Sequence, residues 1–254
     1  NARTAFDRFF AAVEADPGAR KAFPNLRSML EKTADELNRN PRLVRIRLPG
    51  GKPATVRIGG DTLLDAVYSF LYDPDSIPYI PFLIQAAAAG DVSHLAMFTE
   101  ELLYDDLSDG LYYALQGHDE APFSKVPEKA PGVYDPLRLE REMALAFGSG
   151  RAGPEANSPV SSDIPVFILA GGFDPITPAE GTRRAARSLT RGTFLLFPGL
   201  GHAVSTSSGV ERLVAGFLDD PAKSPERLSP ETLAVRPFAV KLFVTAAPYL
   251  LYAR

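Results

Sequence analysis

The chain has 254 residues, of which 45% are hydrophobic and 23% charged, and its formal net charge is −4. This composition is typical of a globular protein and excludes disordered, collagen-like and coiled-coil classes. The absence of cysteine excludes disulfides, thiolate metal sites and a cysteine nucleophile, and three histidines leave little room for an imidazole-rich metal site. We therefore expect no metal and no cofactor, and the charge balance gives no reason to expect nucleic-acid binding.

The charge is unevenly distributed along the chain. Residues 1–60 carry 12 basic and 6 acidic side chains, residues 61–129 carry 2 and 13, and residues 130–254 carry 13 and 12. The acidic middle segment is either a solvated face or a surface that attracts cationic ligands.

The sequence predicts no membrane span, because no apolar run reaches the ~18 residues that a spanning helix needs. The most apolar stretch, Phe238 to Tyr252, is interrupted by Lys241 and Pro248. The sequence begins at Asn1, with neither a methionine nor a signal-peptide pattern, so we expect this start to be a cut end.

The first 110 residues are predicted to be mostly helical, because apolar residues recur there at helical intervals. The predicted helices cover residues 26–37, 63–71, 80–89 and 94–103. Between the first two, the runs 43–48 and 54–58 alternate apolar and basic residues around a Pro-Gly-Gly turn, which predicts a β-hairpin.

A linker separates the mainly helical region from the C-terminal part of the chain. A helix is expected at 136–147, and residues 148–163 are rich in Gly, Pro and Ser, as linkers are. We therefore divide the chain into a mainly helical region with a small hairpin (1–147), a linker (148–163) and a C-terminal region (164–254).

The C-terminal region has the pattern of an α/β protein. The continuous apolar runs 164–170 and 193–197 predict strands buried on both faces, and helices are expected at 178–189 and 210–218. Strand, helix, strand and helix with short connections indicate a parallel sheet with right-handed crossovers.

Asp174 follows the first of these strands, and His202 follows the second. Ligands and catalytic groups gather at the carboxyl edge of open α/β sheets, where neighbouring strands lie ~4.8 Å apart. An aspartate that holds a histidine in one tautomer is the acid–base half of a nucleophilic triad. Either residue alone is more often an ordinary loop residue, but their order and their placement at strand ends favour catalysis.

These residues stand in motifs that resemble a known family. The segments GGFDPITP and PGLGH, in which His202 stands 28 residues after Asp174, resemble the C-terminal region of actinobacterial α/β-hydrolases of the tripeptidyl aminopeptidase and proline iminopeptidase type. Earlier segments, such as AFDRFFAAVEADPGARKAFPNL and DGLYYALQGHDEAPF, are similar to that family's helical lid, so the resemblance covers nearly the whole chain. It implies a lid at 1–147, a core segment at 164–254, the triad acid at Asp174, the base at His202, and a secreted or cell-envelope protein.

The nucleophile of that triad is not found in the sequence. The α/β-hydrolase serine stands in a G-x-S-x-G elbow ahead of the acid and the base, and no such motif occurs in residues 1–254. The segment most similar to this motif, residues 205–209, lacks the leading glycine and follows His202. We therefore interpret its hydroxyls as helix caps. Asp174 as nucleophile, as in haloalkane dehalogenases, would need a small residue two positions later, where Ile176 stands.

The resemblance therefore implies the C-terminal portion of a serine exo-aminopeptidase, whose serine lies in an N-terminal half that is covalently attached or a separate chain. It places the acid that binds the substrate's α-amine near Glu120, with Asp119 as second choice; the structural alternative is that both residues cap the turn before Pro122. Two other functions stay open: an esterase or thioesterase acting on a small natural product, and a non-catalytic module whose acidic lid binds a cationic partner.

Overall fold

The computed structural model describes residues 2–48, 50–102, 108–124, 134–136, 138–148, 150–207, 209–222, 235 and 238–239. The chain packs as two compact units, Asn1–Leu103 with Ser162–Arg254, and Tyr104–Ser161. This division follows packing alone, and the functional division into lid, linker and core stays a prediction.

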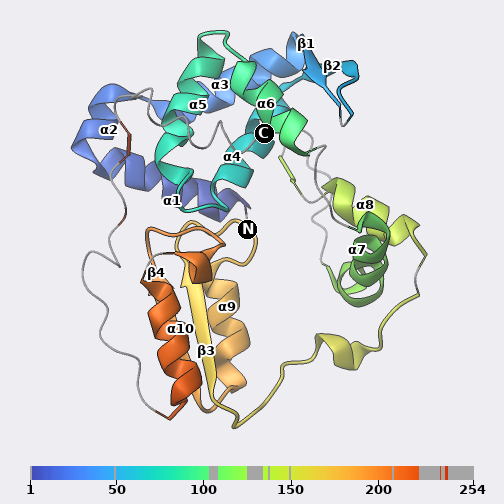
Figure 1. Ribbon diagram of the computed structural model, residues 1–254, viewed down its shortest axis with the longest axis vertical. Coiled ribbons are helices and arrows are strands. Elements are labelled where there is room, and N and C mark those ends of the chain that lie inside the picture. Colours follow the sequence, from blue (N-terminus) through green and yellow to red (C-terminus); the bar gives the residue numbers. More distant parts are fainter. Residues whose placement is uncertain are drawn as a thin grey trace. The chain divides into compact units, whose positions relative to one another are not determined.

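The N-terminal part of the larger unit is a group of helices around one apolar core (Figure 1). The helices are α1 (Ala2–Ala15), α2 (Pro17–Ala22), α3 (Leu26–Arg39), α4 (Gly60–Phe70), α5 (Ile80–Ala88) and α6 (Ser93–Leu102). Their apolar stripes meet in a cluster in which Phe9, Leu63 and Ile84 are fully buried. Each such side chain contributes about 1.5–3 kcal/mol of transfer free energy. The four predicted helices are confirmed, with ends shifted by at most three residues.

The predicted hairpin is also confirmed. Strand β1 (Arg42–Arg47) pairs antiparallel with β2 (Pro53–Ile58), with Val44 opposite Val56. Two glycines at positive φ, Gly50 and Gly51, make the turn, because a left-handed backbone favours residues without a Cβ.

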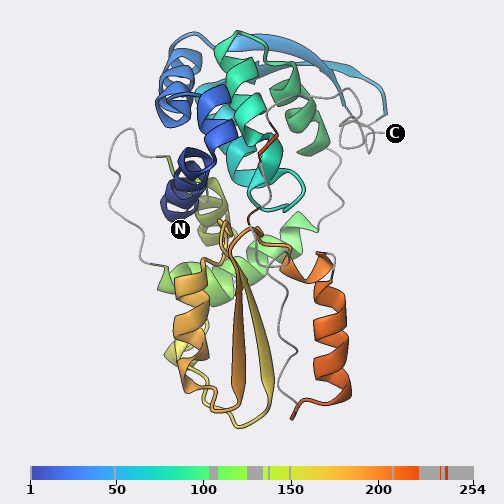
Figure 2. The same ribbon diagram turned by 90° about the vertical axis from the view of Figure 1, so that its left-hand side faces the viewer.

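The C-terminal part of the larger unit is a parallel α/β arrangement, as predicted. Strand β3 (Val166–Gly171) pairs parallel with β4 (Gly192–Phe197). Helix α9 (Ala179–Ala185) contacts one face, where the Arg183 guanidinium lies 4.2 Å from the centre of the Phe194 ring. Helix α10 (Val210–Asp219) covers the other face, where the rings of Phe167 and Phe217 stack at 5.2 Å. Figure 2 shows the two strands side by side, with a helix on each side.

The two strands are less buried than the sequence predicted. Residues 166–169 of β3 and 193–195 of β4 are half-buried, and Leu196 is exposed. The described sheet contains two strands, so each strand lies at an edge and no neighbour covers its outer side.

The smaller unit is helical. It contains α7 (Asp109–Leu115), the π-helical turn η2 (Gln116–Glu120), the 3-10 turns η3 (Ala121–Phe123) and η4 (Pro154–Asn157), and α8 (Arg138–Ala146), which confirms the helix predicted at 136–147. The Tyr112 hydroxyl donates to Glu140 at 3.1 Å and joins α7 to α8. Partial burial of the phenol, together with the Glu140 carboxylate, raises the pKa of Tyr112 to about 12.

Among the described helices, none has both the length and the apolar content needed to cross a bilayer. The apolar stretch near the C-terminus lies outside the described residues, apart from Phe238 and Ala239.

Candidate active site

Asp174 lies three residues beyond the end of β3, in a loop whose path requires glycine at two positions. A Cβ on Gly171 would lie 1.9 Å from the Gly201 carbonyl oxygen, and one on Gly172 would lie 2.3 Å from that of Pro198. Side chains at either position would therefore push the two strand-end loops apart. The close approach leaves Asp174 almost fully buried, at 4% exposure.

His202 lies at the end of the second loop, held against the end of helix α4. Its backbone N–H donates to the Tyr72 carbonyl at 2.8 Å, and a Cβ on Gly201 would lie 2.1 Å from the Leu71 carbonyl oxygen. The Tyr72 ring lies against the imidazole, with the ring centres 4.6 Å apart. The His202 side chain keeps 30% of its surface exposed, so the buried carboxylate meets an imidazole that solvent can reach.

The two side chains meet as the sequence predicted. Nδ1 of His202 lies 3.0 Å from Oδ2 of Asp174 and 3.2 Å from the hydroxyl of Thr177. That hydroxyl donates its single proton to Oδ2 of Asp174 at 2.7 Å, so it can only accept from Nδ1. In the neutral imidazole, both contacts therefore place the proton on Nδ1 and leave Nε2 unprotonated, which is the tautomer that a general base needs.

The second oxygen of Asp174 is also engaged. Oδ1 accepts the backbone N–H groups of Ile176 at 2.8 Å and Thr177 at 2.9 Å. Hydrogen bonds to both oxygens stabilise a carboxylate that is otherwise removed from water, and they fix its plane. Sequence reasoning did not single out Thr177; the available signal was a hydroxyl residue three positions after an aspartate in a turn, where such side chains bond to one another.

The N-terminal helices hold these loops from one side. Nη1 of Arg8 on α1 donates to the Gly172 carbonyl at 3.1 Å, and the same guanidinium pairs with Glu180 at the start of α9. Phe173, directly before Asp174, is buried in the core of the N-terminal helices. The loop that carries Asp174 is therefore anchored to helices far from it in sequence.

Hydroxyls of the segment after His202 were predicted to cap α10, but no described hydroxyl does so. Residue 209 is the N-cap, a glycine at φ 87°, and no side chain caps it. The hydroxyls of Thr206 and Ser207 instead donate to the Ala203 carbonyl, at 3.0 and 3.4 Å. The 3-10 turn over Val204–Thr206 presents that carbonyl to them, so they act as donors and not as acceptors. Ser208 lies outside the described residues.

Glu120 and Asp119 lie in the smaller unit, whereas Asp174 and His202 lie in the larger one. Oδ1 of Asp119 is 2.6 Å from Nδ1 of His118, so this carboxylate already has a basic partner. The side chain of Glu120 is exposed.

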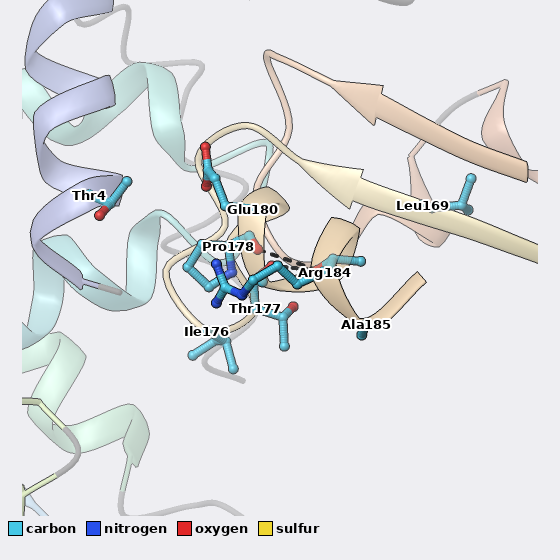
Figure 3. Close-up of a pocket in the computed structure, with 10 residues that line it drawn as sticks. Thr4, Leu169, Ile176, Thr177, Pro178, Glu180, Arg184 and Ala185 are labelled. Carbon is cyan, nitrogen blue, oxygen red and sulfur yellow. Dashed lines mark hydrogen bonds between the residues drawn. The ribbon is translucent and has the colours of Figure 1, made fainter. Parts of the chain in front are cut away.

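A cavity of about 840 Å³ borders the Asp174 loop. It is lined by Thr4 of α1, Leu169 of β3, residues 176–178 of the loop, and residues 180–182, 184 and 185 of α9 (Figure 3). Its volume lies within the range of small-molecule sites, and Thr177 belongs both to its wall and to the hydrogen bonds of the Asp174–His202 pair. The described residues contain no cluster of three His, Asp or Glu that could hold a metal ion.

Comparison with known proteins bears on the segment that carries this pair. Residues 138–228 match the family model of TAP-like proteins, within the α/β-hydrolases. The matched segment contains α8, both strands of the parallel sheet, α9, α10, Asp174 and His202. No curated protein and no solved structure matches the chain. The match supports an α/β-hydrolase and, with it, a hydrolase as the class of enzyme.

Proposed function

We propose that this chain supplies the acid and the base of a serine hydrolase, with Asp174 as the orienting carboxylate and His202 as the general base. The supporting observation is that, in the described part of the chain, both hydrogen bonds of the His202 ring are at Nδ1. In the neutral imidazole this leaves Nε2 free to take a proton from a nucleophile.

We further propose that the nucleophilic serine comes from a segment outside residues 1–254. No G-x-S-x-G elbow occurs in the sequence, and the hydroxyls of Thr206 and Ser207 point their protons at a backbone carbonyl. The general base would deprotonate that serine through Nε2, and the serine oxygen would attack the substrate carbonyl. His202 would then return the proton to the leaving group.

Labelling with a fluorophosphonate tests this assignment in the enzyme complete with its nucleophile. The wild type should be labelled on a serine outside residues 1–254, and His202→Ala should slow labelling by several orders of magnitude. Asp174→Asn should keep the fold and cost roughly 10⁴-fold, because an amide favours the wrong tautomer. His94→Gln is the matched control and should label normally. Normal labelling of a folded His202→Ala variant would rule out this base, and no label in any preparation would favour a non-catalytic module.

We propose an exo-aminopeptidase as the more specific activity, with Glu120 binding the protonated α-amine of the substrate. The support is the resemblance of the segment from Asp109 to Phe123 to that family's lid, together with the exposed carboxylate of Glu120. Asp119 is the second choice, because His118 already occupies its carboxylate. A contact between a carboxylate and an ammonium in a partly closed pocket contributes about 1.5–3 kcal/mol.

Glu120→Gln should therefore lower kcat/KM on free-amine peptides by roughly 10- to 150-fold and leave N-acetylated or simple ester substrates little changed. Glu155→Gln, an exposed acid of the same unit, is the control and should change neither. Equal losses on both substrate kinds would assign Glu120 to folding of the lid. Faster turnover of uncharged esters than of free-amine peptides by the wild type would favour the esterase or thioesterase.

A further inference from the structure

The β1–β2 hairpin lies in a stretch of the chain whose charged residues are all basic. Between Glu36 and Asp61 there is no acidic residue, while six basic residues occur: Arg39, Arg42, Arg45, Arg47, Lys52 and Arg57. The hairpin lies at the periphery of the N-terminal helices in both ribbon views (Figures 1 and 2). It takes no part in the site described above.

The pairing register places three of these arginines on one face of the hairpin. Val44 and Ile46 face the helices together with Ile58, so the alternate positions of both strands form the opposite face. That outer face consists of Leu43, Arg45, Arg47, Pro53, Thr55 and Arg57. All six residues are exposed, and Leu43, directly opposite Arg57, keeps 74% of its surface in solvent.

The arginines of this outer face have no acidic side chain as partner among the described residues. Glu100 contacts this strand at the backbone, where it accepts from the N–H of Arg47 at 3.4 Å. Neighbours on one face of a hairpin lie about 7 Å apart, both along a strand and diagonally across it. Arg45 therefore has a like charge on each side, Arg47 along the strand and Arg57 diagonally across it, and an anionic ligand would relieve the repulsion.

We propose that the outer face of this hairpin binds the surface of an anionic phospholipid membrane. Guanidinium groups bind phosphate in a bidentate manner, and a row of them suits a plane of lipid headgroups. Leu43 favours lipid over nucleic acid as the ligand of this face. An exposed leucine among arginines can enter the acyl boundary of a bilayer but has no partner on a phosphate backbone. The net charge of −4 over the whole chain also opposes a polyanion that would wrap the molecule.

Sedimentation of the full chain with vesicles tests the proposal without an activity assay. The protein should bind phosphatidylglycerol-containing vesicles and not pure phosphatidylcholine, and salt should weaken the binding. Each arginine near an anionic surface contributes roughly 5-fold in partition, so the triple variant Arg45→Gln, Arg47→Gln, Arg57→Gln should lose on the order of 100-fold. A triple variant of exposed basic residues elsewhere, Lys21→Gln, Arg187→Gln, Arg212→Gln, changes the net charge equally and should keep most of the binding.

Leu43→Ser separates the two sources of phosphate. It should weaken vesicle binding several-fold and leave binding to a DNA duplex unaffected. Equal effects of the two triple variants would overturn the proposal, because binding would then follow net charge alone. Wild-type protein that binds duplex DNA as tightly as the vesicles, or that binds neither, would also overturn it. Circular dichroism of each variant checks that the hairpin change leaves the helices folded.

Discussion

At the scale of single residues, Thr177 is the side chain that joins Asp174 to His202. Its hydroxyl donates to Asp174 and accepts from His202, and its backbone N–H binds the other carboxylate oxygen. Removing the hydroxyl would leave Nδ1–H with one partner and would remove one of the hydrogen bonds that fix the plane of the carboxylate. We infer that Thr177 acts through these two residues, as a positioning residue that does not itself touch the reacting atoms.

Thr177→Val should therefore lower kcat of the complete enzyme by roughly 10- to 100-fold with little change in KM, since one hydrogen bond to a charged group is lost in a step that depends on it. Thr177→Ser restores the hydroxyl and should recover most of the rate. Steady-state kinetics on an ester substrate measures both.

Thr190→Val is the matched control for this prediction, because the Thr190 hydroxyl bonds to the Ser162 carbonyl, away from the pair. It should keep wild-type kcat. If Thr177→Val also kept it while its melting temperature fell, the residue would serve the fold alone.

At the scale of elements, the site depends on a close approach between the loop after β4 and the end of α4. A glycine in that loop makes the approach possible. Gly201 lies where a Cβ would meet the carbonyl oxygens of Leu71 at 2.1 Å and Tyr72 at 2.6 Å. Both atoms belong to the backbone at the end of α4, so they cannot move aside as a flexible side chain would. The same close approach sets the hydrogen bond between the His202 N–H and the Tyr72 carbonyl.

Gly201→Ala should lower the free energy of unfolding by about 1–3 kcal/mol, as overpacking does, and should displace His202 from Asp174. Gly216→Ala provides the contrast: this glycine is exposed within α10, and a Cβ there meets nothing within 4 Å. It should stabilise the protein by about 0.5–1 kcal/mol through helix propensity. Urea denaturation measures both values. If Gly201→Ala changed the free energy of unfolding as little as Gly216→Ala does, the end of α4 would have to shift easily to accommodate the added Cβ.

At the scale of the whole molecule, sequence reasoning succeeded where the signal is local. The helices and the hairpin follow from apolar periodicity, and the meeting of Asp174 with His202 follows from the rule that parallel strand ends share one edge. The contacts of Arg8, Tyr72 and Thr177 were not predicted, because the first two join segments more than a hundred residues apart, and the third depends on the exact path of a turn.

The two errors have physical causes of the same kind. The burial of β3 and β4 was predicted from their continuous apolar runs. Burial also requires neighbouring strands on both edges, and the described sheet has only these two strands. The hydroxyls at 206 and 207 suit a helix cap by type, but the Ala203 carbonyl competes for them in the preceding turn. Residue type alone therefore could not determine either outcome.

Two features predict that residues 1–254, purified by themselves, are inactive: no nucleophile is found for His202, and the described sheet has unpaired strand edges. In the proposed role of general base, His202 accelerates nothing without a nucleophile at Nε2. The strands also lack a neighbour on their outer edges within the described sheet, which leaves them prone to aggregation. We expect no turnover of an aminoacyl nitroanilide or an aryl ester above the rate of a His202→Ala control. Turnover that depends on His202 and persists when Ser205, Ser207 and Ser208 are all replaced by alanine would contradict an external serine. Turnover that these three substitutions abolish would instead place the nucleophile in the segment after His202, because each hydroxyl there lies within a few residues of the base.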